Sequence, residues 1–149
     1  MITNCIGDVY RSDVNIIYNP VSIRNDHMFQ KKVRIIHPDI YNTYRDMVYN
    51  DTVKLGEIQL LPTSHEKQCM MNGFCYDKRG KINILAFTKT LVELCNVANE
   101  YHLSVGIDEN VVKSEIWTPD RVRTIIEEVF RGTDVEVKIF KYQKTTKRA

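Results

Sequence analysis

Polar side chains of three chemically useful kinds follow apolar stretches that are typical of buried strands. Asp8, Asn19 and Lys89 each come directly after such a stretch, and the polar loop 108–115 follows another. In open α/β sheets, ligands bind at the carboxyl ends of the strands. A carboxylate there accepts hydrogen bonds from an amine, an amide bridges two hydroxyls, and a desolvated lysine holds an anion or attacks an electrophilic carbon. This set indicates a site for a ribose-containing nucleotide.

Each of these residues also fits a purely structural role. Asp8 suits an Asx turn, Asn19 a turn before Pro20, and Lys89 a solvated first turn of a helix. Residue type alone does not separate the two interpretations, so the elements that position these side chains have to be considered.

The hydrophobic pattern predicts strands that alternate with helices. The expected strands are residues 2–6, 14–18, 56–61, 70–76, 82–87, 103–107 and 135–142, and the expected helices are residues 26–36, 38–50, 89–102 and 119–130. The second strand is expected to stop at Asn19 and Pro20. Such alternation is typical of an α/β fold with a mixed, mostly parallel sheet flanked by helices on both faces. The chain shows neither a linker nor a repeat, which predicts one domain over residues 1–149 with a basic tail at 142–149.

Capping residues mark the expected helix ends. Asp26, Thr88 and Thr118 are suitable N-caps, and the prolines after His37 and Thr118 fit a first helical turn. Gly132 suits the position after the last helix. The segment "YDKRGK" has turn chemistry, and we expect it to join strands 70–76 and 82–87 into a hairpin.

Composition narrows the function classes. The chain has 149 residues and a net charge of +2, so its charge balance does not indicate a nucleic-acid partner. It has neither a stretch of about 18 apolar residues nor a signal-peptide pattern, which predicts a soluble cytoplasmic protein without membrane contact. His65, Cys69 and Cys75 lie close in sequence, but the chain has no C-x-x-C pair, so we expect thiols, no metal site and no cofactor.

Three longer segments resemble one known family. The opening "GDVYRSDVNIIYNPVS" resembles that of macrodomains, in which Gly-Asp-Ile/Val precedes an apolar strand that ends in Asn-x-x-Asn. The segment "WTPDRVRTIIEEVFRGTDVEVKIFKY" resembles their last helix and strand, and "YDKRGKINILAFTK" resembles a hairpin of the terminal ADP-ribose protein glycohydrolases. The resemblance covers most of the chain and implies a three-layer α/β/α macrodomain fold, with the glycohydrolase branch as the most similar one.

The resemblance also implies roles for particular residues. Asp8 would bind the adenine amino group, the Val9 amide would lie behind the ring, and Asn19 would lie near the distal ribose. Ser22 stands where the family has its second Asn. In the glycohydrolase branch a strand carries the catalytic lysine, and Lys89 takes its place in this alignment. It would attack the anomeric carbon of an ADP-ribosyl ester.

Two loops depart from the family pattern. The segment "IRNDHMFQKKV" lacks the glycines whose backbone amides wrap phosphates, although Arg24 or Lys31 could pair with phosphate instead. The segment "GIDENVVKSEIW" is also without its glycine-rich stretch, and the position of the catalytic Asp falls on Lys113, which cannot act as a carboxylate base.

Two functions are therefore open. The first is binding of ADP-ribose or a related nucleotide, with ADP-ribosylated protein as partner and with activity, if present, as an ADP-ribosyl hydrolase or an ADP-ribose 1″-phosphate phosphatase. The second is a macrodomain scaffold without ligand that acts through protein contacts, for which Met70, Met71 and Phe74 could form the contact surface. Those apolar residues also fit an additional edge strand that packs on the sheet.

Overall fold

The computed structural model describes residues 1–24, 30–50, 53–112 and 114–143. They form a six-stranded sheet in the order β1-β6-β5-β2-β4-β3, in which β3 pairs antiparallel with β4 and the remaining pairs are parallel. The elements are β1 (Ile2–Ile6), the short 3-10 helix η1 (Val9–Arg11), β2 (Ile16–Ser22), α1 (Lys31–Ile36), α2 (Pro38–Tyr49), β3 (Ile58–Pro62), β4 (Cys69–Tyr76), α3 (Ile84–Tyr101), β5 (Val105–Asp108), α4 (Pro119–Phe130) and β6 (Val137–Lys141).

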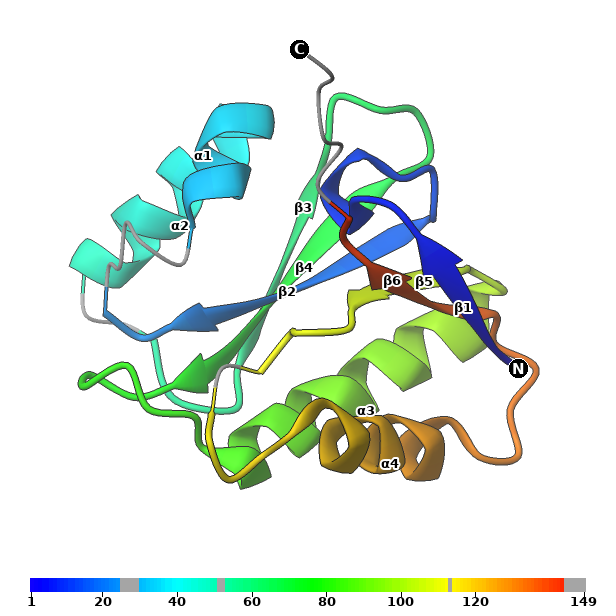
Figure 1. Ribbon diagram of the computed structural model, residues 1–149. Coiled ribbons are helices and arrows are strands. Elements are labelled where there is room, and N and C mark those ends of the chain that lie inside the picture. The colour runs from blue at the N-terminus through cyan, green and yellow to red at the C-terminus, as the bar shows by residue number, and fades with distance from the viewer. Residues whose placement is uncertain (25–29, 51–52, 113, 144–149) are drawn as a thin grey trace, which may run out of the picture.

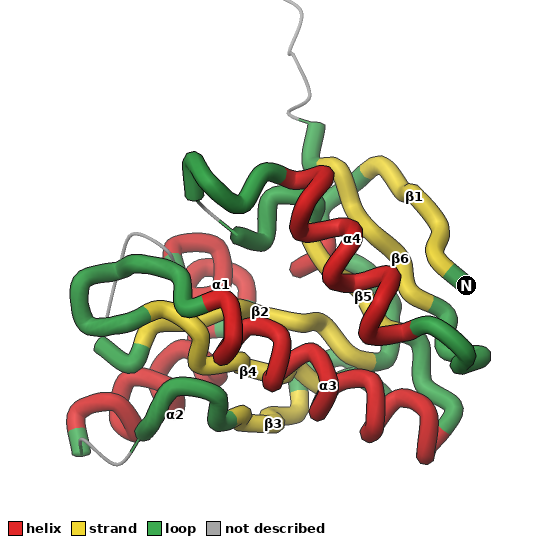
Figure 2. The backbone as a smooth tube through the Cα atoms, turned by 90° about the horizontal axis from the view of Figure 1, so that it is seen from below, coloured by secondary structure: helices red, strands yellow, loops and turns green. Residues whose placement is uncertain are grey.

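The helices cover the sheet on both faces, as the sequence predicts. Figure 1 shows α1 and α2 on one face and α3 and α4 on the other, and Figure 2 shows α3 and α4 side by side across the strands. Successive residues of β2 point to opposite faces, so that Ile17 and Val21 pack toward α2 while Ile16 and Tyr18 pack toward α3. The expected three-layer α/β/α architecture is confirmed.

Several expected boundaries are also confirmed. Helix α2 begins with Pro38 in its first turn, and the Thr118 side chain caps α4 by accepting a hydrogen bond from the Arg121 amide. Gly132 follows α4 with φ 79°, a value that favours glycine. Helix α1 begins at Lys31, and the expected cap Asp26 lies outside the described residues.

The prediction of a strand at residues 82–87 is wrong. Residues from Ile84 onward form the first turns of α3, and the Asn83 side chain caps this helix by accepting a hydrogen bond from the Ala86 amide at 2.9 Å. Thr88 is not the cap, because its hydroxyl donates to the Ile84 carbonyl inside the helix. A short apolar run fits a buried strand and a buried helix equally well, and here the Asn83 cap decides for the helix.

The hairpin of the sheet consequently lies elsewhere. β3 and β4 form the antiparallel pair, whereas the segment after β4 makes one isolated bridge, from Ile82 back to Tyr76. Met70, Met71 and Phe74 are buried strand residues of β4, which lies between β2 and β3. The expectation that they form an exposed contact surface is wrong, and β4 is also not an edge strand.

β2 does not stop at Asn19. It continues through Pro20 to Ser22, with Asn19 opposite Asn72 and Pro20 opposite Gly73 of β4. Its other neighbour, β5, pairs only with Ile16 and Ile17. From Tyr18 onward one side of β2 is therefore an open edge, where a proline that cannot donate a hydrogen bond is tolerated.

Candidate functional site

The carboxyl ends of the parallel strands meet on one edge of the molecule, where β2 and β5 part after Ile17 (Figure 1). Asp8 follows β1, Asn19 is the middle residue of β2, Asp77 follows β4 and Asp108 ends β5. Strands that diverge at the point where the chain changes direction in the sheet leave a crevice, which is the usual ligand site of such folds. This edge is the candidate site.

Asp8 lies between backbone and cationic partners. Its Oδ1 accepts a hydrogen bond from the Tyr10 amide at 3.0 Å, which makes Asp8 the N-cap of η1. Its Oδ2 lies 3.1 Å from Lys32 Nζ and 3.8 Å from Arg11 Nε. The Asp8 side chain is 12% exposed. Asp8 is thus an Asx-turn residue and also an ion-pair partner.

Lys32 reaches Asp8 from α1 and also contacts an aromatic ring. Its ammonium lies 3.4 Å from the centre of the Tyr142 ring, which is a cation–π contact. The Lys32 side chain remains 40% exposed. The ammonium is therefore held between the Asp8 carboxylate and an aromatic ring.

Asn19 is buried in a network of amides and one phenol. Its Oδ1 accepts a hydrogen bond from the Tyr10 hydroxyl at 2.8 Å, and its Nδ2 donates to Gln30 Oε1 at 3.0 Å and to Asn72 Oδ1 at 2.8 Å. Asn72 in turn donates to Gln59 Oε1 at 3.0 Å. The network ties β2, β3, β4, the residue before α1 and the loop after β1 together on the α1 and α2 face.

Tyr10 connects the two expected ligand contacts, because its amide binds Asp8 and its hydroxyl binds Asn19. Burial raises the pKa of the Tyr10 phenol, and the nearby Asp108 and Asp8 carboxylates raise this pKa further. The phenol is therefore a neutral donor throughout the physiological range. Tyr10 is not among the residues predicted from the sequence. Its position in the chain, between Asp8 and Asn19, is the sequence feature that could have indicated it.

Val9 and Ser22 lie beside this group. Val9 has no exposed surface and packs with the α1 and α2 core. The Ser22 hydroxyl donates to the Asp77 carbonyl at 3.2 Å and accepts a hydrogen bond from the Arg24 amide at 3.0 Å. Ser22 thus links the end of β2 to the turn after β4.

Lys89 lies apart from these residues. It is an exposed residue of α3, on the opposite face of the sheet from the Asn19 side chain, and its side chain passes beside Gly56. The structure brings Asp8, Val9, Asn19 and Ser22 to one edge and does not bring Lys89 to them.

Another lysine stands at the end of a strand in the same segment. Lys78 comes two residues after β4, in a turn that the Asp77 side chain holds by accepting hydrogen bonds from the Arg79 and Lys81 amides at 2.8 and 3.0 Å. These amides hold the pKa of the Asp77 carboxyl below its usual value. Lys78 is exposed, and Ser22 contacts the same turn. The sequence interpretation missed Lys78 because it assigned residues 82–87 to a strand.

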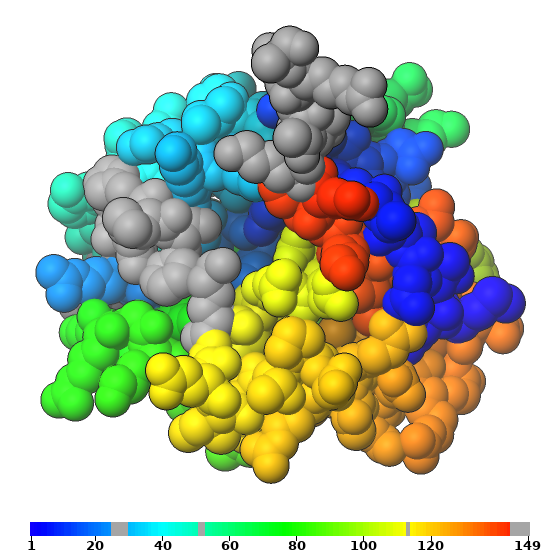
Figure 3. All heavy atoms as spheres, viewed as in Figure 1, coloured from blue at the N-terminus to red at the C-terminus, as the bar shows by residue number. Residues whose placement is uncertain are grey.

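The segment between β5 and α4 also lies at the carboxyl ends of the strands. The space-filling view shows it at the surface beside α4 (Figure 3). Asp108 accepts a hydrogen bond from the Asn110 amide at 2.7 Å, and Asp108, Asp120 and Arg123 contribute to a hollow of about 80 Å³ between β5 and the start of α4. Lys113 lies outside the described residues.

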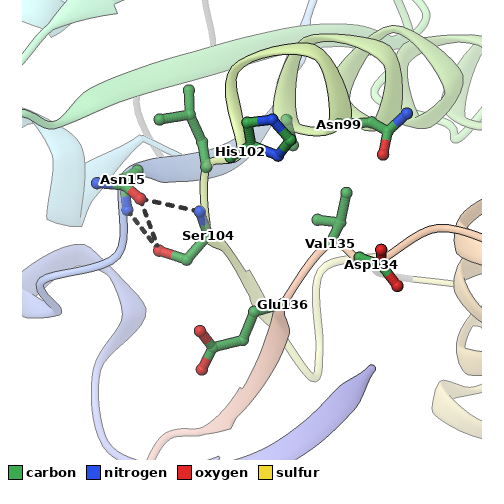
Figure 4. Close-up of a pocket in the computed structure, with 9 residues that line it drawn as sticks. Asn15, Asn99, His102, Ser104, Asp134, Val135 and Glu136 are labelled. Atoms are coloured by element: carbon green, nitrogen blue, oxygen red, sulfur yellow. Dashed lines mark hydrogen bonds between the residues drawn. The ribbon is translucent and has the colours of Figure 1, made fainter.

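Two larger hollows lie at the opposite edge, at the amino ends of the strands. One, of about 310 Å³, is lined by Asn15, Asn99, His102 and Asp134 among others, and Figure 4 shows Asn15 and Ser104 joined by three hydrogen bonds at one side of it. The other, of about 580 Å³, lies at the β3–β4 turn. The five residues of the predicted site line none of the three hollows described here.

Neither metal nor membrane features stand out in the described ranges. Among these residues no three His, Cys, Asp or Glu side chains are grouped closely enough to hold a metal ion. A helix with the length and apolar character needed to cross a bilayer is likewise absent from the part of the chain that the structure describes.

Comparison with known proteins gives matches at the level of structure. Neither a family model nor a curated protein sequence matches the chain. The macrodomain of Mycobacterium tuberculosis DarG superposes with a TM-score of 0.78 at 19% identity, over 94% of this chain and 97% of that one. The macrodomain of Thermus aquaticus DarG gives 0.76 at 15% identity, over 97% and 99%.

A third structure carries a ligand. Thermosipho africanus DarTG in complex with ADP-ribose superposes with a TM-score of 0.73 at 11% identity, over 99% of this chain and 43% of that one. Identities this low establish the fold and leave the glycohydrolase branch a prediction. The strand order, the helix layers and these superpositions together show that the chain is a divergent protein with the macrodomain fold.

Proposed function

We propose that this protein binds ADP-ribose or a related nucleotide at the carboxyl edge of its sheet. The observation that carries the proposal is the grouping of Asp8, Asn19 and Ser22 at the point where β2 and β5 part, in a macrodomain fold. The ADP-ribose complex of Thermosipho africanus DarTG, which shares the fold, supports the choice of ligand.

The adenine end of the ligand would replace Lys32 at Asp8. The Lys32 side chain is 40% exposed, and an ion pair at that exposure contributes only about 0–1 kcal/mol. The adenine amino group donates a hydrogen bond to the same carboxylate oxygen, so the exchange costs little.

Removal of ADP-ribose from an acidic side chain is the reaction that would follow from such binding. A neutral lysine amine attacks the anomeric carbon, the bond from that carbon to the ester oxygen breaks, and the carboxylate leaves with the proton that the amine loses. Water then releases ADP-ribose and restores the amine. Lys78, at the end of β4, is better placed for this role than Lys89, which lies on the other face of the sheet.

Calorimetry with ADP-ribose tests the binding. We expect measurable heat below millimolar ligand and an affinity at least tenfold lower in Asp8→Ala, since a charge-assisted hydrogen bond contributes about 1.5–3 kcal/mol. Asp13→Ala is the matched control, because Asp13 is an exposed aspartate of the same loop. Absence of binding by the wild type at millimolar ADP-ribose would refute the proposal.

Hydrolysis requires a separate assay. A protein that is ADP-ribosylated on acidic side chains serves as substrate, and the released ADP-ribose is measured with Lys78→Ala, Lys89→Ala and, as control, Lys81→Ala. Loss of turnover only in Lys78→Ala supports the strand-end lysine, and loss only in Lys89→Ala supports the lysine chosen from sequence. Release of phosphate from ADP-ribose 1″-phosphate is measured in parallel.

A second candidate is a ligand-free scaffold that acts through protein contacts. The contacts of Asp8 with Lys32 and of Asn19 with Tyr10 favour it, because both expected ligand contacts already have internal partners. The contact surface would have to be rebuilt from exposed apolar residues such as Leu85 and Ile116, which are 80% and 68% exposed. The protein partners recovered from cells are compared between variants. Recovery that is unchanged in Asp8→Ala and lost in Leu85→Asp would support this candidate.

A further inference from the structure

The Tyr10 side chain lies between the two residues that are expected to contact a nucleotide. η1 is only three residues long, and it is held at its start by Asp8 and at its end by the Ser12 amide and hydroxyl, which donate to the Val9 carbonyl at 3.1 and 2.7 Å. From this short helix the Tyr10 ring extends to Asn19, where its hydroxyl donates to Oδ1 at 2.8 Å.

The hydrogen-bonding capacity of Asn19 is almost fully used. A side-chain amide has two N–H donors and an oxygen with two lone pairs. Both donors are engaged, by Gln30 and Asn72, and one lone pair is engaged by Tyr10. Asn19 is 1% exposed, and Gln30 and Asn72 are 2% and 0% exposed. A ligand hydroxyl cannot reach the Asn19 side chain unless one of these partners leaves.

Tyr10 is the partner that can leave with the smallest change in structure. Asn72 is anchored in the centre of β4, between two paired strands, and Gln30 also donates to the Pro20 carbonyl at 3.4 Å. Tyr10 belongs to the short helix η1 and not to a paired strand, so rotation of its side chain breaks no strand pairing.

We propose that Tyr10 is a built-in competitor of the ligand, whose phenol hydroxyl occupies on Asn19 the place that a ribose hydroxyl of the ligand would take. The inference rests on the proposed nucleotide binding and adds its regulation. In the resting protein the Tyr10 hydroxyl holds this place on Asn19. Nucleotide binding then requires the ring to rotate away, which lowers the apparent affinity by the fraction of molecules that are open.

The geometry supports this exchange chemically. A phenol and a ribose hydroxyl are both neutral donors of similar size, and the buried Tyr10 phenol stays protonated because burial and the Asp108 and Asp8 carboxylates raise its pKa. The exchange thus replaces one neutral hydrogen bond by another and leaves no buried amide of the network without a partner.

Two substitutions distinguish the effect of the Tyr10 ring on ligand binding from the effect of its hydroxyl. Tyr10→Phe removes only the hydrogen bond to Asn19, and Tyr10→Ala also removes the ring. Calorimetry with ADP-ribose is expected to give at least tenfold tighter binding for Tyr10→Ala and a smaller gain for Tyr10→Phe. Tyr49→Ala is the matched control, because Tyr49 is 74% exposed at the end of α2.

Ribose 5-phosphate and AMP serve as shorter probes in the same experiment. Tyr10 competes at the place of the distal ribose, which AMP lacks. We therefore expect Tyr10→Ala to bind ADP-ribose and ribose 5-phosphate more tightly than the wild type does, and AMP only slightly more tightly. Equal or weaker binding of ADP-ribose by Tyr10→Ala, with normal binding by the wild type, would overturn the inference and leave the proposed function intact. Absence of binding by wild type and variant alike would overturn both.

A measurement on the wild type covers the case in which Tyr10→Ala does not fold. In protein labelled with carbon-13 tyrosine, the Tyr10 ring signal is identified by its loss in Tyr10→Phe. We expect ADP-ribose to move this signal toward the shift of solvent-exposed tyrosines. A signal that stays in place while ligand binds would refute the competitor role.

Discussion

Substitution of Asn19 by alanine tests whether internal hydrogen bonds hold the Asn19 side chain in the protein without ligand. The Asn19 side chain has three hydrogen-bond partners among Tyr10, Gln30 and Asn72. In Asn19→Ala the Asn72 and Gln30 oxygens each lose a donor while they are 0% and 2% exposed. The Tyr10 hydroxyl loses its acceptor in the same variant. A buried polar group without a partner costs about 1–3 kcal/mol.

The expected loss of stability follows from those two oxygens. Water that enters the space left by the amide recovers part of the cost, so we expect Asn19→Ala to lower the free energy of unfolding by about 2–4 kcal/mol. For a chain of this size that corresponds to a melting temperature lower by roughly 5–15 °C. Urea unfolding followed by circular dichroism measures the free energy, and Asn99→Ala is the control because Asn99 is exposed on α3.

A double-mutant cycle adds a direct test of the contact between Tyr10 and Asn19. Tyr10→Phe removes one partner and Asn19→Ala the other, and the expected coupling free energy is about 0.5–1.5 kcal/mol. If Asn19→Ala is as stable as the wild type and the coupling is zero, the Asn19 amide is not held in the resting protein. The site would then be open, and the inference about Tyr10 would lose its basis.

Three further changes test the fold that positions the site. Gly73→Ala places a Cβ 2.8 Å from the Tyr18 hydroxyl and 2.9 Å from Thr90 Oγ1, so urea unfolding should show a loss of about 1–3 kcal/mol. Asn83→Ala removes the cap of α3 and should cost about 1 kcal/mol in the same assay, whereas Asn83→Ser should retain most of the stability. Burial raises the pKa of the Cys75 thiol from 9.0 to about 12, so its contribution to stability is complete below pH 9 and is lost as the pH rises toward 12; Cys75→Ala should flatten that part of the pH–stability curve.

Much of the fold follows from local signals in the sequence. The terminal helix has the cap Thr118, a proline at its start and buried residues at helical spacing, so its pattern admits one interpretation. The segment "INILAF" has no such spacing, because its five apolar residues fit a strand and a buried helical turn alike. Asn83 inside this run was the only local sign of a helix start, and its cap geometry is visible only in three dimensions.

Pro20 illustrates a different limit of sequence reasoning. A proline ends a strand when the neighbouring strand on its N–H side needs the missing donor, and it is tolerated when that side of the strand is unpaired. Whether β5 follows β2 beyond Ile17 depends on residues about 90 positions away in the chain, and pairing at that range leaves no local signal. The sequence therefore places Asn19 correctly beside the edge but ends its strand too early.

The contacts of the site residues were the least predictable feature. The family resemblance brings Asp8 and Asn19 to one edge, because strand order fixes where each strand ends. The resemblance does not predict the contacts of Lys32 and Tyr10. An internal partner of Asp8 and a ligand bound to Asp8 both require the same carboxylate, so the sequence does not distinguish them. The internal contacts at Asp8 and at Asn19 differ in free energy. The partly exposed Lys32 ion pair at Asp8 contributes about 0–1 kcal/mol, whereas the buried Asn19 network contributes several hydrogen bonds of about 0.5–1.5 kcal/mol each. The ribose end, and with it Tyr10, therefore decides whether the site opens.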